Sequence, residues 1–231
     1  MTNIENSEAW YEERIAFLSG FMTDERFAVL GKAVQMRTRY MTILTENTFH
    51  PQNASALVRH CEAFGLQDIH TVETLCKFNP NLRVVRGTDK WIDFRRHKST
   101  TEAVAALREA GYRIVATTPH KQDTTPDTFD VTRGKFALVF GTELAGISEE
   151  IVASADEFLR IPMCGMVESL NVSASAAILI QRLSARMRQQ TQNWPLQHAE
   201  QLEVLFRWAR ESVQDADKIL ARQQELFTIR S

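Results

Sequence analysis

The sequence predicts an α/β fold with a parallel sheet, and three observations carry that prediction. From Tyr40 onward, short β-rich runs alternate with helical stretches, which is the pattern of parallel strands joined by helices. Gly65 and Gly111 stand where two of these helices should end, and glycine readily adopts the left-handed conformation found there. The run KFALVFG, residues 135–141, is almost continuously apolar, as a strand covered on both faces would be.

Five strands and four helices are expected in this central region. The strands are expected at residues 40–46, 68–72, 113–118, 135–141 and 157–163. The helices are expected at residues 53–65, 100–111, 148–156 and 170–187. Ser148 is a suitable N-cap for the third of these helices, because its hydroxyl can accept a hydrogen bond from a free backbone N–H group.

Helical extensions are expected on both sides of this region, which divides the chain into residues 1–36, 37–190 and 191–231. The first extension carries apolar residues at helical spacing, namely Trp10, Ile15, Leu18, Phe21, Phe27 and Leu30. The second should begin near Pro195 and carries an apolar stripe made of Leu202, Leu205, Phe206, Ala209, Val213, Ala216, Ile219 and Leu220. Each extension needs a surface to cover, which could be its own domain, a partner subunit or the other extension.

Length and composition are those of an ordinary globular protein. The 231 residues are 44% hydrophobic and 24% charged, which excludes a wholly disordered chain. No apolar run approaches the length of a membrane-spanning helix, and the first residues lack the basic start and apolar block of a secretion signal. We therefore expect a cytoplasmic protein without membrane contacts.

The formal net charge of −2 does not by itself indicate a nucleic-acid-binding protein. The basic residues, however, gather in two stretches. The first contains Arg26, Lys32, Arg37 and Arg39. The second contains Arg83, Arg86, Lys90, Arg95, Arg96 and Lys98. These stretches are either solvated surfaces or contacts for phosphate groups.

Several common functional patterns are absent from the sequence. The nine glycines never form Gly-x-Gly, so the dinucleotide-binding fingerprint is missing, and no Walker pattern occurs. The sequence has no His-Glu-x-x-His motif and no cluster of cysteine and histidine, so no metal ligands are expected. A conventional Rossmann cofactor site and a metal-dependent enzyme are therefore disfavoured.

The first of three candidate stretches is HPQNASALVRH, residues 50–60, at an expected strand-to-helix junction. Open α/β sheets bind ligands at such junctions. Asn53 should open the helix, and Arg59 follows nearly two turns later. The alternative interpretation is an asparagine N-cap followed by an exposed helical arginine.

The second candidate stretch is LVFGTELAGIS, residues 138–148, where an apolar strand runs into a loop. Gly141 and Gly146 flank Glu143 in this loop. Glycines allow the backbone to approach a ligand closely, and the carboxylate could fix the loop. The alternative interpretation is a plain turn between a strand and a helix.

The third candidate stretch is IPMCGMVESLNVSASAA, residues 161–177, and it is the least ordinary of the three. Pro162 and Gly165 prevent regular structure, while the methionines and Leu170 are apolar. Apolar walls with exposed backbone amides could hold an adenine ring. The start of the following helix is crowded by Ser169, Asn171, Ser173 and Ser175. Alternatively, the serines only cap this helix, and its small residues let it pack closely.

Taken in order, these three stretches resemble the three sequence motifs of the SpoU/TrmH ribose 2'-O-methyltransferases, which belong to the SPOUT class. The resemblance covers roughly residues 40–188. It implies a SPOUT fold with a deep trefoil knot in the C-terminal part of the sheet, an exception to the rule that chains avoid threading. It also implies S-adenosyl-L-methionine as the cofactor and a homodimer with the active site at the subunit interface.

The resemblance further implies a role for each residue that matches a motif position. The implied cofactor contacts are Thr117, Gly141, Ile161, Met163 and Leu170. Arg59 is the implied catalytic arginine, acting near the cofactor of the partner subunit. The remaining motif residues, which would shape the active site and position the ribose, are Asn53, Glu143, Ser169 and Asn171.

The short extensions resemble those of family members that methylate the ribose of guanosine 18 in the D-loop of tRNA. Transfer of a methyl group from S-adenosylmethionine to that 2'-hydroxyl is therefore the expected activity, with tRNA and not DNA as the partner. Arg37 and Arg39, with residues 83–98, would then contact phosphates. Alternative targets are rRNA or the tRNA wobble ribose. The non-enzymatic alternative is an RNA-binding protein that has lost transfer activity.

Overall fold

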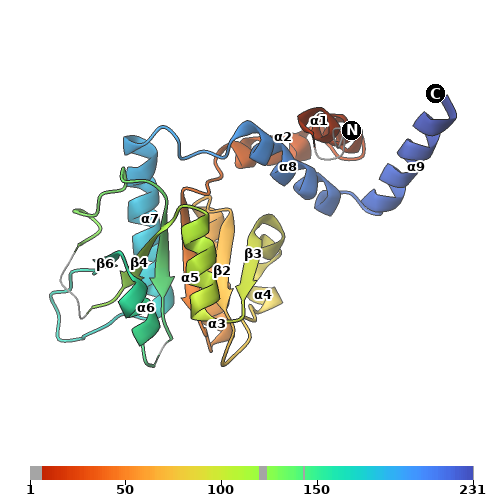
Figure 1. Cartoon of the computed structure of the whole chain (residues 1–231). Coiled ribbons are helices and arrows are strands. Elements are labelled where there is room, and N and C mark those ends of the chain that lie inside the picture. Colours follow the sequence, from red (N-terminus) through yellow and green to blue (C-terminus); the bar gives the residue numbers. More distant parts are fainter. Residues whose placement is uncertain (1–6, 120–123, 143, 231) are drawn as a thin grey trace. The chain divides into compact units, whose positions relative to one another are not determined.

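The structure is a computed structural model of the chain, and it describes residues 7–119, 124–142 and 144–230. The chain divides into two compact units. The larger unit is Thr38–Trp194 (Figure 1). The smaller unit joins the described residues of Met1–Arg37 to those of Pro195–Ser231.

The larger unit is built on a parallel sheet, as the sequence predicts. Its described strands form one six-stranded sheet in the order β3-β2-β1-β5-β4-β6, and every pairing is parallel. The strands are β1 (Met41–Glu46), β2 (Asp68–Val72), β3 (Asp93–His97), β4 (Arg113–Thr117), β5 (Phe136–Phe140) and β6 (Glu157–Leu159). From β1 the chain builds outward through β2 and β3. It then crosses to the other side to form β4, adds β5 between β1 and β4, and ends the sheet with β6 beyond β4. Ligands of open α/β sheets bind near such a change of direction, at the carboxyl ends of the strands.

Helices cover both faces of this sheet (Figure 1). The helical segments of the unit are α3 (Pro51–Ala63), α4 (Leu82–Val85), η1 (Thr88–Trp91), α5 (Thr100–Glu109), α6 (Glu149–Ser154) and α7 (Val172–Gln190). Ile43 and Leu138 pack in one core with residues of α3 and α7. Their neighbours Leu44 and Val139 pack in a second core with residues of α5 and α6. This two-sided burial explains why the central strands have continuous apolar runs.

Two elements differ from the sequence-based expectation. β3 (Asp93–His97) is a sixth strand that the pattern does not predict, because its exposed Arg95 and Arg96 hide the apolar signal. It pairs only with β2 at the edge of the sheet, where charged residues discourage further strand pairing. β6 covers only Glu157–Leu159 and not the whole expected range 157–163.

The helix ends follow local chemistry, with one correction. Gly65 and Gly111 adopt φ values of 79° and 83°, as expected for residues that follow a helix. Ser148 is the N-cap of α6 and accepts a hydrogen bond from the backbone N–H of Ile151 at 3.2 Å. α3, in contrast, begins at Pro51, so Asn53 lies in its first turn and does not open the helix. Proline suits that first position because it has no N–H group to leave unsatisfied.

The smaller unit is helical, and its two chain segments cover one another. Its helices are α1 (Glu8–Ser19), α2 (Asp24–Gln35), α8 (His198–Ser212) and α9 (Ala216–Arg230). The buried residues of its core come from both segments and are Ile15, Leu18, Leu202, Phe206, Ala209, Val213 and Ala216. Each extension therefore covers the other, which is the third of the possibilities that the sequence leaves open.

Two details of the smaller unit differ from expectation. Phe21 is 51% exposed and follows α1 instead of packing in the core. Pro195 does not start a helix, because α8 begins at His198 with Gln197 as its N-cap. A capping box explains that start: the Glu200 side chain accepts a hydrogen bond from the Gln197 N–H at 2.9 Å.

The longest helix of the described chain is α7, with 19 residues. One of its faces is buried against the sheet, whereas another carries Arg182 and Arg186, which contact Asp127 and the Pro126 carbonyl. Throughout the part of the chain that the structure describes, no helix combines the length and apolar character that crossing a bilayer requires.

Candidate active site

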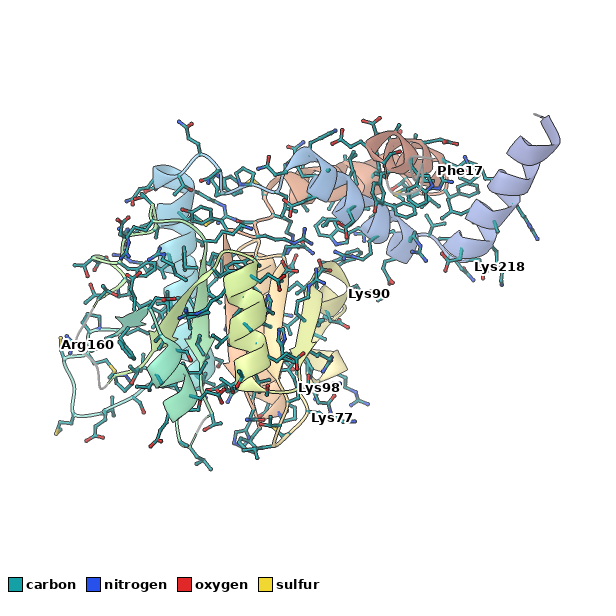
Figure 2. The ribbon with its side chains drawn as sticks, in the orientation of Figure 1. Phe17, Lys77, Lys90, Lys98, Arg160 and Lys218 are labelled. Atoms are coloured by element: carbon teal, nitrogen blue, oxygen red, sulfur yellow. The ribbon has the colours of Figure 1, made fainter. Side chains whose placement is uncertain are left out.

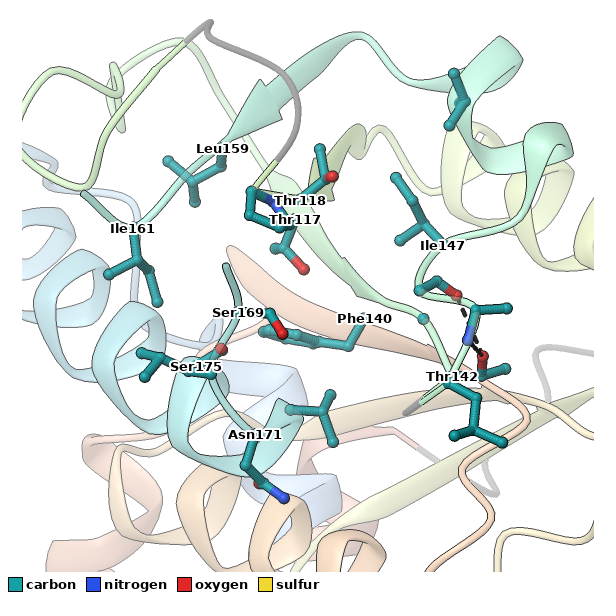
Figure 3. A pocket seen from close by; sticks show the side chains of 18 of the residues that line it. Thr117, Thr118, Phe140, Thr142, Ile147, Leu159, Ile161, Ser169, Asn171 and Ser175 are labelled. Atoms are coloured by element: carbon teal, nitrogen blue, oxygen red, sulfur yellow. Dashed lines mark hydrogen bonds between the residues drawn. The ribbon is translucent and has the colours of Figure 1, made fainter. Parts of the chain in front are cut away.

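A pocket of about 560 Å³ opens at the carboxyl ends of three neighbouring strands (Figure 3). Thr117, Phe140 and Leu159, the last residues of β4, β5 and β6, line it. Asn171 and Ser175, at the start of α7, line the opposite side. The volume is that of a small-molecule site, and the position is where parallel sheets bind ligands.

One wall of the pocket is the loop that follows β5. The loop requires glycine at two positions, each for a different reason. A β-carbon on Gly141 would lie 2.0 Å from the carbonyl carbon of Gly146, so only glycine fits there. Gly146 has a φ of 72°, which favours glycine. Thr142 and Gly146 exchange backbone hydrogen bonds of 2.8 and 3.0 Å, which close the loop into a tight hairpin (Figure 3). Glu143, the third residue singled out in this loop, lies outside the described residues.

The third candidate stretch forms another wall of the pocket. Residues 160–171 have no regular secondary structure, as Pro162 and Gly165 lead one to expect. The pocket-lining residues of this stretch are Ile161, Met163, Ser169, Leu170 and Asn171. Asn171, and not a serine, is the N-cap of α7: its Oδ1 accepts hydrogen bonds from the N–H groups of Ser173 and Ala174.

The first and third stretches meet through two asparagines. The Nδ2 group of Asn171 donates a hydrogen bond to Oδ1 of Asn53 at 3.2 Å. Asn53 is 8% exposed, whereas Asn171 is exposed, so the contact is half-buried. The interpretation of Asn53 as an N-cap is wrong, because His50 holds that position. The asparagine instead links α3 to the edge of the pocket.

Thr117 lines the pocket, but its hydroxyl already has a partner. Its Oγ1 donates to the carbonyl oxygen of Val139 at 2.7 Å. The hydroxyl proton therefore bridges β4 and β5, and the side chain offers a ligand its methyl group and a remaining lone pair.

Two described candidates, Asn53 and Arg59, do not line the pocket of their own chain, and only Arg59 lacks a hydrogen bond to a described residue that does. Arg59 is exposed on α3, and its guanidinium donates to the carbonyl oxygen of Val84 at 3.1 Å. That contact holds the side chain toward α4. The pocket thus gathers Thr117, Gly141, Ile161, Met163, Ser169, Leu170 and Asn171, with Asn53 attached through Asn171.

Comparison with known proteins identifies the family of the chain. Residues 40–181 match the model of the SpoU rRNA Methylase family. The chain belongs to this family. It is 36% identical, over 88% of its length, to the tRNA (guanosine(18)-2'-O)-methyltransferase of Borreliella burgdorferi, of which 93% is covered.

Solved structures of SpoU proteins have the same fold. The TrmH/SpoU tRNA modifying enzyme of A. aeolicus superimposes with a TM-score of 0.72 at 29% identity, covering 83% of this chain and 98% of that one. The rRNA methyltransferase from Sinorhizobium meliloti, solved with AdoMet bound, gives a TM-score of 0.57 at 26% identity, covering 68% and 60% of the two chains.

His60 lies on α3, in the first SpoU motif, and its side chain contacts the start of α7, which belongs to the third motif. Burial lowers its pKa, the neighbouring Arg59 lowers it further, and a hydrogen bond with the backbone of Ser173 opposes both effects. The imidazole is therefore neutral at neutral pH and joins α3 to the first turn of α7. In the sequence, this histidine is indistinguishable from five others that are scattered along the chain.

Several pocket residues of this SpoU protein are missed by reasoning from the sequence alone. They are Thr118, Phe140, Thr142, Ile147 and Ser175. Phe140 carried a usable signal, because the last residue of a buried strand lies at the edge where ligands bind. Ile147 carried none, since only the closed hairpin turns it toward the pocket.

Two arginines of the first basic stretch, Arg37 and Arg39, bind other parts of the protein. Arg37 is 3% exposed, and its guanidinium lies over the ring of Trp208 at 4.9 Å. Arg39 donates hydrogen bonds to Asp68 and Asp93 at 2.8 and 2.9 Å. Both arginines are thus engaged in structural contacts, and the expectation that they contact phosphates is wrong. The second stretch, in contrast, is exposed.

Proposed function

We propose that this protein transfers a methyl group from S-adenosylmethionine to the ribose 2'-hydroxyl of guanosine 18 in the D-loop of tRNA. The observation that carries the proposal is the pocket, because residues of the second and third SpoU motifs line it and the first motif is attached by Asn53. The target is supported by the relative from Borreliella burgdorferi, whose similarity extends beyond the SpoU motifs over most of both chains.

The residues of the pocket fit S-adenosylmethionine. Ile161, Met163 and Leu170 offer apolar walls for an adenosine, and Gly141 leaves the end of β5 without a side chain. The volume suits a ligand of that size. When bound, the cofactor supplies a methyl group that its positively charged sulfur activates toward attack.

The protein has to orient the ribose and help its hydroxyl lose a proton. We assign the orientation to Asn53, Ser169 and Asn171, which lie together at one edge of the pocket, and to Glu143 of the second motif. Arg59 keeps its charge in a protein and is no proton acceptor. Its role is to hold a neighbouring phosphate and to stabilise the negative charge that develops on the ribose oxygen, while a phosphate oxygen or water accepts the proton.

Arg59 points to a homodimer. Because it does not line the pocket of its own chain, we propose that it acts at the pocket of a partner subunit. Large apolar side chains around the site are exposed and would be covered by that partner: Leu144, Met166, Val167, Leu170 and Ile178. Exposed large apolar side chains near a site are a feature of surfaces that bind a partner.

The tRNA surface that we propose is the basic edge, defined as Lys77, Arg83, Arg86, Lys90, Arg95, Arg96 and Lys98. All seven side chains are exposed, and Figure 2 shows the three lysines on the β3 side of the larger unit. Two of these cations also contact carboxylates, since Arg95 pairs with Asp68 and Arg96 with Glu73. Asp68 and Asp93 bind Arg39 as well. Cations that face solvent in a row suit the phosphate backbone of RNA.

We propose that the C-terminal part of the SpoU region, which contains β6 and α7, forms the trefoil knot of the SPOUT class. Residues 37–190 would be the methyltransferase domain, and residues 1–36 and 191–231 its helical extensions. Cleavage by a protease at the two junctions, with mass spectrometry of the resistant fragments, tests this division.

The experiment that tests the function is transfer of labelled methyl from S-adenosylmethionine to a tRNA transcript. We expect incorporation into the wild-type transcript and none when guanosine 18 is replaced. Incorporation that survives the replacement would contradict the D-loop target, and mapping 2'-O-methyl groups in RNA from a deletion strain would then separate an rRNA target from the wobble ribose. Calorimetry without binding of S-adenosylmethionine would instead support the RNA-binding protein that has lost transfer.

A further inference from the structure

A buried carboxylate stands at the carboxyl end of β1, outside the pocket. Glu46 is the last residue of that strand and is 3% exposed. It accepts hydrogen bonds from Ser148 twice, from the backbone N–H at 3.0 Å and from the hydroxyl at 2.8 Å. It accepts a third from the hydroxyl of Thr100 at 2.7 Å. Three donors therefore converge on one carboxylate.

This convergence is what permits a carboxylate to be buried. A carboxylate without partners in the protein interior would be strongly destabilising. Here Thr100 is the first residue of α5 and Ser148 is the N-cap of α6. Both partners therefore stand at the start of a helix. The interaction ties the central strand to two elements on one face of the sheet.

One of these ties reaches the cofactor pocket. Ser148 directly follows Gly146 and Ile147, which line the pocket. At its other end the same loop is closed by the hydrogen bonds between Thr142 and Gly146. The loop is thus fixed at two points: the hairpin fixes it beside β5, and Glu46 fixes it beside α6. Glu46 itself does not line the pocket within the described residues.

We propose that Glu46 is a positioning residue, which holds residues 144–148 of the loop in the conformation that binds the cofactor. The identity of that cofactor rests on the proposed function. Glu46 does not touch the cofactor or the ribose. Its removal should therefore weaken cofactor binding and spare the transfer step once the pocket is saturated.

The central test is Glu46→Gln in the full-length protein. Both hydroxyls donate to Oε1, and the Ser148 N–H donates to Oε2. Glutamine keeps the volume but replaces one of these oxygens by an NH₂ donor, so either the Ser148 N–H or the two hydroxyls lose their acceptor. We expect the dissociation constant of S-adenosylmethionine, measured by calorimetry, to rise roughly tenfold, because hydrogen bonds to a charged group are the strong ones. The KM for the cofactor should rise in parallel, with the KM for tRNA and kcat within about twofold of wild type.

A second measurement reads the loop directly. Hydrogen exchange of the backbone amides of residues 146–151 should speed up in Glu46→Gln, because the Ser148 N–H and the start of α6 are held by this carboxylate. Ser148→Ala removes a donor from the loop side and should weaken cofactor binding in the same direction. The double variant should be weaker than wild type by less than the product of the two single effects, since both remove the same interaction.

Thr100→Val is the matched control. It removes a donor to the same carboxylate from α5, which does not line the pocket. We expect it to lower the urea midpoint about as much as Glu46→Gln does, but to change cofactor affinity by less than about twofold. Equal losses of affinity in both variants would overturn the proposal, because Glu46 would then act only through general stability.

The outcomes separate this proposal from the proposed function. If wild type binds S-adenosylmethionine and folded Glu46→Gln binds it equally well, the positioning role is refuted and the function stands. If wild type does not bind it, the proposed function is refuted. In that case unchanged exchange of residues 146–151 in Glu46→Gln would also overturn the positioning role, whereas faster exchange would support it for whatever ligand the pocket takes.

Discussion

At the scale of single residues, Gly141 is the position with the least freedom. A β-carbon there would overlap the backbone of Gly146, which the hairpin of the same loop brings against it. The sequence suggests that glycine lets backbone approach a ligand. The structure gives a different reason, because the close approach is between two parts of the protein.

Replacing Gly141 by alanine should open this loop. The added methyl group has no space, so we expect a loss of roughly 1–3 kcal/mol of unfolding free energy, the usual cost of overpacking. Binding of S-adenosylmethionine should fall below detection in calorimetry, because Gly141, Gly146 and Ile147 line the pocket together. Gly31→Ala is the control: its methyl group meets nothing within 4 Å, and both quantities should be retained. Wild-type affinity in Gly141→Ala would show that the loop has no part in cofactor binding.

The residues of the site were predictable from the sequence to different degrees. Asn171 and Gly141 stood out because unusual residue types interrupt a strand-to-helix junction, and both line the pocket. Glu46 and Ile147 were not predictable, since each acquires its role through a contact with residues far away in the sequence. A lone glutamate at the end of a strand has no pattern that distinguishes it from a solvated one.

At the scale of elements, β2 and β3 share a buried pair of histidines. The rings of His70 and His97 stack with centroids 5.2 Å apart, and their nitrogens Nδ1 and Nε2 are 3.0 Å apart. Burial lowers the pKa of His70 to about 3, and His97 and Arg95 add to the effect. Burial also lowers the pKa of His97, which Glu102 partly opposes. Both imidazoles are therefore neutral in the folded protein at neutral pH.

This pair should make stability depend on pH. In the unfolded chain the imidazole of His70 is protonated below about pH 6.5, whereas in the folded chain it is protonated only near pH 3. The contribution of His70 to the unfolding free energy is therefore complete above about pH 6.5 and is lost as the pH falls toward 3. From about pH 7.5 to about pH 5, His70 alone should lower the unfolding free energy by about 2 kcal/mol, as measured by urea unfolding. The profile should be flatter in His70→Gln and unchanged in His198→Gln, whose ring is exposed. A profile as steep in His70→Gln as in wild type would assign the dependence to other groups.

The basic edge yields a prediction about salt. In Lys77→Gln/Lys98→Gln, the slope of log affinity for tRNA against log salt should decrease by roughly 0.7–0.9 for each phosphate that the protein no longer neutralises. The Kd for cofactor should stay unchanged, because neither lysine lines the pocket. Lys218→Gln is the control from the smaller unit, where Nζ contacts Asp215 at 2.8 Å. An unaltered slope in the double variant would place the RNA elsewhere.

Elements were predictable where burial is two-sided and less so at the edge. β1 and β5 are both buried along their whole length, and β5 appears in the sequence as an apolar run. β3 was missed because a strand that pairs on one side only can carry Arg95 and Arg96. The sequence predicts the start of α3 two residues after its actual start at Pro51. The N-cap His50 makes no side-chain cap hydrogen bond, and Asn53 is the residue type that is typical of an N-cap.

At the scale of the whole molecule, the proposed homodimer can be tested by mixing inactive variants. Arg59→Ala leaves the pocket intact, whereas Gly141→Ala removes the pocket and leaves Arg59. If Arg59 acts at the partner's pocket, each heterodimer regains one working site. A randomly assorted equal mixture should then recover about a quarter of wild-type transfer activity, since half the dimers are mixed and each has one of two sites. No recovery after unfolding and refolding the mixture would place Arg59 at its own pocket.

The helical unit has a consequence for how the chain emerges from a ribosome. Ile15 and Leu18 are covered by Leu202 and Phe206, which are synthesised roughly ten seconds or more later at typical elongation rates. During that interval the strands of the larger unit can already assemble, while α1 displays an uncovered apolar face. A nascent chain stalled before α8 should therefore recruit chaperones at its first helix, and a premature stop codon near Gln190 should yield an aggregating product with its catalytic motifs complete.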